Sequence, residues 1–281
     1  MMNLQLPVNA MAMKAPRFGF QAWQPSDSMF FQQALMHGDV IVHDVDTQRD
    51  FIDPPDAGRG LAVPGATGIL GTLKALVDTI RQYIFPQNDF QLLHIQTRDQ
   101  HTPDDAEFDA WPPHCIENTA GADKVPETVL SQKLRVISND PNANDLPDAD
   151  ELKEIIRTGT TIDLHKRNLG FAWDREVTGT DPATGKRISI NTPRPKALKF
   201  LDILKQSGKR VALVYGVATD YCVKYAVEAY KQSGIIPIVV EDAIKGIAPN
   251  CNDDPFFDDV LSMPLSQVKA EFAAAKTQLA P

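Results

Sequence analysis

The sequence has few cysteines and no long apolar run. Its 281 residues include three cysteines, Cys115, Cys222 and Cys251, which cannot all pair with one another and do not form a disulfide framework. No apolar stretch approaches the roughly 20 residues that a membrane-spanning helix needs. Residues 1–7 lack the basic segment and apolar core of a secretory signal. We therefore expect a protein of the reducing cytoplasm with no membrane partner.

An excess of positive charge is also missing. The 28 Lys and Arg residues are outnumbered by 37 Asp and Glu residues, which gives a net charge of −9. Nucleic acids and anionic membrane surfaces attract basic proteins, so neither is expected as a partner. Internal repeats and low-complexity tracts are absent too. One large globular domain with insertions fits this length and composition, and two domains are the alternative.

What the sequence does contain is an alternation of short apolar runs with segments of helical spacing. The apolar runs predict strands at 40–45, 90–97, 134–138, 160–165, 211–215 and 235–240. Helical spacing predicts helices at 65–83, from a cap at Asp148 or Asp150 to about 157, at 195–206, from 222 to about 232, and at 265–279. This alternation is typical of a three-layer αβα fold with a mainly parallel central sheet.

The chain is interpreted as one domain with an extension and two insertions. Residues 1–37 carry scattered aromatic residues without clean periodicity, and we treat them as an N-terminal extension. This extension is an arm lying on the body or on a neighbouring subunit, or else a partly ordered tail. Residues 38–281 form the α/β domain, with insertions near 135–160 and 174–190. The turn residues at 180–186 indicate a hairpin in the second insertion.

Cys222 stands where a buried strand turns into a helix. That point lies at the carboxyl edge of the sheet, where open α/β folds bind ligands. A cysteine in the first turn of a helix feels the positive end of the helix dipole, which favours the thiolate. The free N–H groups of such a turn also receive a developing oxyanion. The alternative is a buried structural cysteine.

Two more strand ends carry residues with complementary chemistry. Asp46 follows the strand at 40–45, and Lys166 follows the strand at 160–165. A carboxylate can accept the proton of a thiol, and a nearby ammonium group stabilises both anions. Alternatively, Asp46 caps a turn, Lys166 is a solvated surface lysine, or Asp50 is the carboxylate that matters.

A metal site is indicated by Asp99, His101 and His114. In an extended chain residues i and i+2 point to one face, so Asp99 and His101 can share one ion. His114 follows two prolines, which stiffen its backbone. One carboxylate and two imidazoles suit Zn, Fe or Mn, with Asp105 or Glu107 as a fourth ligand. The alternative is an exposed loop that carries these residue types by chance.

The motifs resemble those of the isochorismatase-like cysteine hydrolases, and of the nicotinamidases in particular. They are Asp46-Thr-Gln-Arg-Asp-Phe51, Asp99-Gln-His101, Trp111-Pro-Pro-His-Cys115, Lys166 and Gly216-Val-Ala-Thr-Asp-Tyr-Cys-Val223. The resemblance covers about residues 39–247. It departs from the usual pattern at Tyr221, where His or Asn is more common, and no last strand is identifiable after 242–247.

The resemblance implies a role for each of these catalytic residues. Cys222 would be the nucleophile, Asp46 the proton acceptor and donor, and Lys166 the cation that tunes both. The backbone N–H groups of Ala218 and Cys222 would form an oxyanion hole, next to a cis peptide bond between Val217 and Ala218.

The resemblance also implies a cofactor and a substrate. Asp99, His101 and His114 would hold one divalent metal ion, with Glu107 preferred as the fourth ligand because some relatives use Glu. Phe51 and Trp111 would wall the substrate ring. The implied reaction converts nicotinamide and water to nicotinate and ammonia in a homo-oligomeric enzyme. Another amide, carbamoyl or ureido substrate, or a non-catalytic binding role, remains the alternative.

Overall fold

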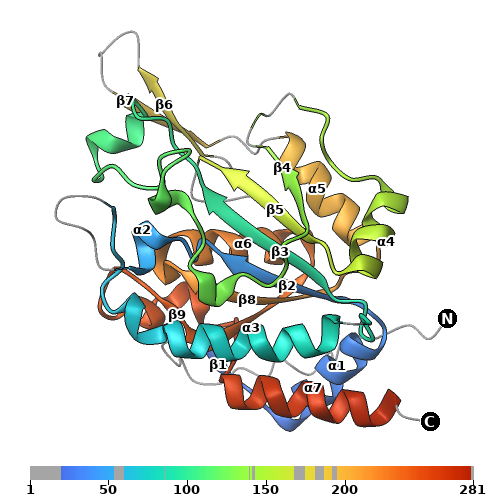
Figure 1. Cartoon of the computed structure of the whole chain (residues 1–281). Coiled ribbons are helices and arrows are strands. Elements are labelled where there is room, and N and C mark those ends of the chain that lie inside the picture. The colour runs from blue at the N-terminus through green and yellow to red at the C-terminus, as the bar shows by residue number, and fades with distance from the viewer. Residues whose placement is uncertain are drawn as a thin grey trace.

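The centre of the protein is a parallel sheet of eight strands in the order β1-β10-β9-β8-β2-β3-β5-β4 (Figure 1). The computed structural model describes residues 20–53, 60–85, 87–138, 140, 143–167, 175–180, 187–191 and 195–279. The strands of the sheet are β1 (Gln21–Ala22), β2 (Val40–Val45), β3 (Leu93–Asp99), β4 (Leu134–Ile137), β5 (Thr161–Lys166), β8 (Val211–Val217), β9 (Ile236–Lys245) and β10 (Leu261–Met263). All neighbouring pairs in it are parallel.

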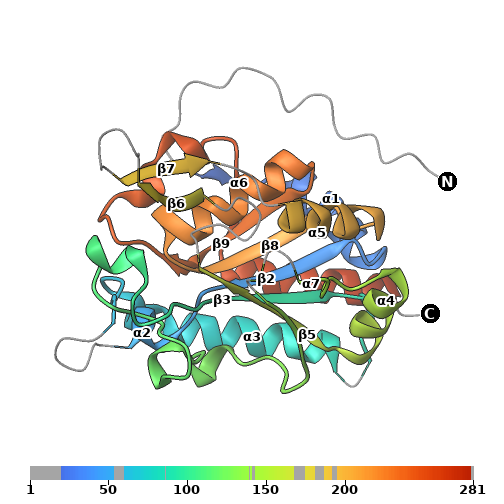
Figure 2. The ribbon, with the colours of Figure 1, turned by 90° about the horizontal axis from the view of Figure 1, so that it is seen from above.

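Helices cover both faces of this sheet, as Figure 2 shows. One layer contains α1 (Pro25–Met36), α3 (Leu70–Ile84) and α7 (Leu265–Leu279), and the other contains α4 (Ala149–Thr158), α5 (Pro195–Gln206) and α6 (Lys224–Ser233). The short α2 (Arg49–Ile52) follows β2. The expected three-layer αβα architecture is therefore confirmed. No helix among the described residues is both long and apolar enough to cross a bilayer.

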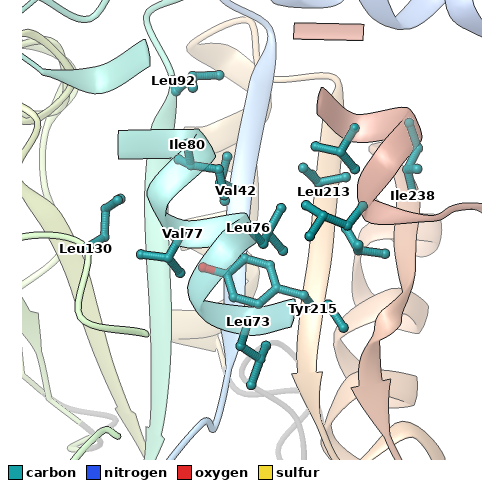
Figure 3. Close-up of a cluster of buried hydrophobic side chains, with 14 of the residues drawn as sticks. Val42, Leu73, Leu76, Val77, Ile80, Leu92, Leu130, Leu213, Tyr215 and Ile238 are labelled. Carbon is teal, nitrogen blue, oxygen red and sulfur yellow. The ribbon is translucent and has the colours of Figure 1, made fainter. Parts of the chain in front are cut away.

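The helix α3 shows how apolar spacing builds the core. Its Leu73, Leu76 and Val77 recur at helical spacing and are fully buried. They pack over the sheet beside Leu213 and Tyr215 of β8 (Figure 3). Both β2 and β8 are buried along their whole length because helices cover them from both sides. This rigid centre positions the loops at the carboxyl edge of the sheet.

The start and end of α4 follow from two residues. The Asp148 side chain accepts hydrogen bonds from the N–H groups of Asp150 and Glu151, so Asp148 is the cap of this helix. Gly159 ends α4 in the left-handed conformation, with φ of 64°, which glycine adopts without the strain of a side chain. Of the two residues expected to cap α4, the structure selects Asp148.

The segment before residue 38 is built into the fold from residue 20 onwards. β1 pairs with β10, and α1 packs along α7. Glu271 on α7 is 1 % exposed, and its carboxylate accepts hydrogen bonds from Trp23 (3.0 Å), Ser28 (2.5 Å) and Gln32 (2.7 Å). The extension expected at 1–37 thus lies on the body over 20–37, and residues 1–19 are outside the described part.

Two strands differ from their expected bounds by three or more residues, and β10 was not expected. β3 begins at Leu93 rather than residue 90, because the chain turns at Gln91, whose φ is 47°. β9 extends to Lys245, beyond the expected end at 240, since its last residues pair with the end of β8. β10 is the last strand that no sequence pattern revealed, and it has only three residues.

The hairpin expected in the second insertion has two antiparallel strands. These are β6 (Arg175–Thr180) and β7 (Arg187–Asn191), which form a separate two-stranded sheet. The turn expected at 180–186 lies outside the described residues from 181 onwards.

Candidate active site

Four neighbouring strands deliver reactive side chains to one edge of the sheet. Asp46 directly follows β2, Asp99 ends β3, and Lys166 ends β5. β8 leads through an irregular turn to Cys222. Because β8, β2, β3 and β5 lie next to one another and are parallel, their carboxyl ends meet at the same edge. The topology alone therefore brings these four residues together.

Lys166 is the centre of this group. Its Nζ atom lies 2.8 Å from Asp46 Oδ2, 3.3 Å from Asp99 Oδ1 and 3.5 Å from Cys222 Sγ. Asp46 is 0 % exposed, Lys166 4 % and Cys222 6 %. In such a buried setting the ammonium group is held by its two carboxylates. The alternative of a solvated Lys166 is therefore wrong.

Burial and charge set the resting protonation of this group. Burial raises the pKa of Cys222 well above its ordinary value, and the charge of Lys166 opposes that shift only in part. Burial lowers the pKa of Lys166, but Asp46 and Asp99 outweigh it, and the net pKa is well above its ordinary value. The resting pair is therefore a thiol beside an ammonium ion. Attack by Cys222 needs a base, and Asp46 is the adjoining carboxylate.

The backbone before Cys222 is shaped by a close approach of two strands. Gly216 has φ of 121°, and a Cβ atom there would lie 2.0 Å from the carbonyl oxygen of Val45, so only glycine fits. The next bond, between Val217 and Ala218, is cis, as the resemblance implied. The Ala218 carbonyl then accepts the N–H of Val223. The oxyanion hole at Ala218 and Cys222 stays a prediction.

The helix expected from residue 222 begins slightly later. Tyr221 has φ of −127° and ψ of −105°, which lies outside the helical region, and the regular helix α6 starts at Lys224. Cys222 consequently sits in the turn that precedes α6 rather than in its first regular turn. The expected helix from 222 to about 232 is corrected to Lys224–Ser233.

A second cluster adjoins the first through Asp99. Asp99 Oδ2 lies 3.3 Å from His101 Nε2 and 3.8 Å from His114 Nε2. All three residues are buried, and one ligand atom from each lies within 4.8 Å of the others. The loop after β3 brings His114 back to β3, because His101 bridges to Ile116. The three expected metal ligands are thus neighbours in space.

Two contacts turn the imidazoles toward Asp99. His101 Nδ1 lies 3.1 Å from Asp105 Oδ2, and His114 Nδ1 lies 2.7 Å from the carbonyl oxygen of Pro112. Both Nε2 atoms are left facing Glu107, whose oxygens lie 3.7 Å from His114 and 4.0 Å from His101. Of the two candidates for a fourth ligand, Glu107 faces the cluster and Asp105 supports His101 from behind.

The electrostatics of this cluster fit a divalent cation. Burial and the charge of Asp99 raise the pKa of Glu107. Burial lowers the pKa of His101, but contact with Asp99 outweighs it and raises the pKa to about 9. The His101 Nε2 atom is buried without a hydrogen-bond partner. Ligand atoms at about 2.1 Å from a tetrahedral ion lie about 3.4 Å apart, close to the spacing seen here.

One pocket lies between the Cys222 thiol and the cluster of Asp99, His101 and His114. It is lined by Phe51, Leu61, Val63, Asp99, Glu107, Trp111, His114, Ala218, Tyr221, Cys222 and Ile247. The two residues expected to wall a substrate ring, Phe51 and Trp111, are both in this lining. Asp99, Glu107 and His114 supply its polar part, and Cys222 opens onto the same space.

Two side chains near Asp46 support the site without lining the pocket. The Gln48 amide donates hydrogen bonds to the carbonyl oxygens of Asp99 (2.8 Å) and Ala122 (2.9 Å), and its oxygen accepts the N–H of Asp99 (2.7 Å). Asp50 Oδ2 accepts the N–H of Cys115 at 2.8 Å. Asp50 is therefore a support for the loop that holds His114. The polar string after β2 signalled the region, but not the support that Gln48 gives to Asp99.

A second buried ion pair, which joins Lys124 to Asp44, two residues before Asp46, was not predicted from the sequence. Lys124 Nζ lies 2.8 Å from Asp44 Oδ1, and both side chains are almost fully buried. The Thr47 hydroxyl donates to Asp44 at 2.8 Å and lies 2.7 Å from the Thr128 hydroxyl. These contacts fasten the end of the loop that carries His101 and His114 to strand β2.

Breaking this pair on one side is expected to destabilise the protein strongly. The Lys124→Met variant leaves a buried, unpaired Asp44, so its free energy of unfolding should fall by about 3–5 kcal/mol. The double variant Asp44→Val/Lys124→Met replaces both charges with apolar groups and should recover most of that loss. Urea denaturation followed by circular dichroism measures both. Equal stability of Lys124→Met and the wild type would contradict the conclusion that Asp44 and Lys124 form a buried ion pair.

The comparisons with known proteins agree with this geometry. No family model matches the chain. A curated nicotinamidase/pyrazinamidase of Mycobacterium tuberculosis is 26% identical over a 213-residue alignment that covers 73% of this chain and 85% of that protein. In sequence, therefore, the chain is similar to a nicotinamidase over most of its length.

Solved structures give the fold. An isochorismatase-like hydrolase from Alkaliphilus metalliredigens superimposes with a TM-score of 0.54 at 16% identity, over 83% of this chain and 99% of the other. PnC1 from L. infantum, solved in complex with nicotinate, gives a TM-score of 0.52 at 18% identity, over 82% and 94%. The chain has the α/β fold of the isochorismatase-like hydrolases.

Proposed function

We propose that this protein is a metal-dependent amidohydrolase that converts nicotinamide and water to nicotinate and ammonia. The observation that carries the proposal is that the candidate nucleophile adjoins the candidate metal ligands. Lys166 contacts both Cys222 and Asp99, and Cys222 and Asp99 line the same pocket. The similarity to a nicotinamidase/pyrazinamidase supports the same assignment.

The first half-reaction forms a thioester on Cys222. Asp46 takes the thiol proton, and the sulfur attacks the carboxamide carbon. Lys166 stays charged throughout, because the two carboxylates beside it hold its pKa high. The backbone N–H groups of Ala218 and Cys222 receive the oxyanion. Asp46 then gives its proton to the leaving nitrogen, the C–N bond breaks, and ammonia departs.

The second half-reaction hydrolyses the thioester. Asp46, again a carboxylate, takes a proton from a water molecule that attacks the acyl carbon. The C–S bond breaks, nicotinic acid leaves and gives its own proton to solvent or ammonia to become nicotinate, and the sulfur of Cys222 recovers the proton from Asp46. The Asp46 carboxylate thus acts twice as a base and twice as an acid, and the residues return to their starting state.

A divalent metal ion would be held by Asp99, His101 and His114, with Glu107 as the fourth protein ligand. These oxygen and imidazole ligands suit Zn, Fe or Mn. When bound, the ion would anchor the ring nitrogen of the substrate, as a Lewis acid does. Phe51 and Trp111 would wall the ring, so that its carboxamide group reaches Cys222.

Ammonia release from nicotinamide tests the proposal. Purified protein is expected to release ammonia, to lose most of this activity after treatment with a strong chelator, and to regain it with added Zn²⁺, Fe²⁺ or Mn²⁺. Loss of one outer contact of a metal ligand typically costs about 10–100-fold in metal affinity or activity, so loss of the ion itself should cost at least as much. Full activity of protein shown by elemental analysis to be metal-free would contradict the metal assignment.

A related amide is the second candidate substrate. Tyr221 lines the pocket and contacts Trp111. The nicotinamidases that this sequence resembles more often have His or Asn at the position before the cysteine, so this part of the pocket wall differs from theirs. A panel of carboxamides, carbamoyl compounds and ureido compounds, each assayed with and without chelator, separates the two candidates. Dependence on the metal only for amides with a ring nitrogen favours nicotinamide.

A further inference from the structure

The pocket that leads to Cys222 is narrow. Its cavity volume is about 30 Å³, whereas pockets that hold small-molecule ligands usually measure about 300–1,000 Å³. An aromatic carboxamide is several times larger than a water molecule, and Cys222 itself is only 6 % exposed. A substrate of the proposed class therefore reaches the thiol only after part of the pocket wall moves.

The outer part of the wall is formed by residues that are only half-buried. Leu61, Trp111, Tyr221 and Ile247 are half-buried, whereas Cys222 and most of the remaining lining residues are buried. Of these four, the two aromatic side chains touch each other across the pocket. The ring centroids of Trp111 and Tyr221 lie 5.5 Å apart at an angle of 88°, which is the favoured edge-to-face arrangement.

Among the described residues, the Tyr221 side chain is held by apolar packing against the two core clusters rather than by a hydrogen bond. The Trp111 backbone is fixed by its N–H bond to the Glu107 carbonyl oxygen (3.0 Å) and by the two prolines that follow. Within the described part of the chain, the Tyr221 hydroxyl has no hydrogen-bond partner. A rotamer change of this half-buried side chain breaks apolar contacts but no hydrogen bond to a described residue. It breaks the contact with Trp111 without displacing the backbone of Cys222.

We propose that Trp111 and Tyr221 form the gate of the Cys222 pocket and that the Tyr221 ring limits the size of the group that reaches the thiol. This inference deepens the proposed function, on which it rests for the identity of the substrate. Flat carboxamides pass after one ring rotation. Amides with bulky groups outside the ring plane require Trp111 to move as well, so they are excluded.

Thiol alkylation tests the gate without any assumption about the substrate. A small reagent, iodoacetamide, and a bulky one, N-phenylmaleimide, are compared in a Cys251→Ala background, because Cys251 is the remaining half-exposed thiol and Cys115 is 0 % exposed. Mass spectrometry assigns the label to Cys222. The ratio of the two rates cancels any change in the reactivity of the thiol itself.

The Tyr221→Ala variant is expected to raise the bulky-to-small rate ratio about tenfold, because it removes a contact of the strength of one aromatic pair. Tyr221→Phe is the matched control: it keeps the ring and should keep the ratio. Equal ratios in the Ala and Phe variants, with both proteins folded by circular dichroism, would overturn the gate. If the labelling ratios change as expected but no amide releases ammonia, the proposed function is wrong and the proposal of a gate is retained.

Discussion

The Cys222→Ala variant is expected to lose at least about 10⁴-fold in the rate of amide hydrolysis, the order seen when a catalytic nucleophile is removed. Cys222 opens onto the same pocket as Asp99 and His114, and the backbone before it is shaped by Gly216 and the cis bond that follows. Alanine keeps that backbone and removes only the sulfur. Ammonia release and the melting temperature, measured on the same preparation, check the activity and the fold.

The Cys251→Ala variant is the matched control for this experiment. Cys251 is also free, but it is half-buried and does not line the pocket that contains Cys222. Its replacement should leave the rate within about twofold of wild type, as expected of a substitution away from the reacting groups. Retained activity in Cys222→Ala, with the control unchanged, would remove the cysteine from the mechanism and with it the thioester.

The Lys166→Met variant is expected to lose both activity and stability. Met leaves the buried carboxylates of Asp46 and Asp99 without their shared cation, so the free energy of unfolding should fall by about 3–5 kcal/mol. Hydrolysis should fall by about 10²–10⁴-fold, because the ammonium group that contacts both Asp46 and Cys222 is lost from the proton-transfer site. Initial rates and urea denaturation provide the two measurements.

The Lys166→Arg variant distinguishes the effect of the positive charge from the effect of the shape of the side chain. It keeps the positive charge, but the guanidinium group is larger and planar, and it replaces an Nζ atom held 2.8 Å from Asp46 and 3.5 Å from Cys222. We expect it to recover more stability than activity. Near-native hydrolysis in the Met variant would show that Lys166 is not required at this site.

The fold was predictable where local pattern and tertiary environment agree. The strands at 40–45 and 211–217 are rich in apolar residues because both faces of the sheet are covered there, and the runs predicted at 40–45 and 211–215 located Asp46 and the turn to Cys222. α1 and β10 escaped prediction for physical reasons. Only three α1 residues are buried, so its apolar side is short, and β10 is too short to have a period.

The individual residues of the candidate site were predictable, but most of the contacts between them were not. Strand ends and short motifs singled out Asp46, Asp99 and Lys166, but contacts between distant segments were invisible. The pairing of Asp44 with Lys124 joins a strand to the end of a long loop, and no local signal links the two. The contact of Trp111 with Tyr221 likewise depends on how the loop after β3 folds back toward the turn after β8.

The position of β1 has a consequence for the order in which the protein assembles. The first described strand pairs with β10, the last strand among the described residues, and α1 packs against α7. During synthesis β1 and α1 leave the ribosome long before β10 and α7 are made. Because contacts between distant segments form late and slowly, the segment with β1 and α1 stays without these partners until β10 and α7 have also emerged. The edge of the sheet at β1 is therefore one of the last parts of the fold to be completed.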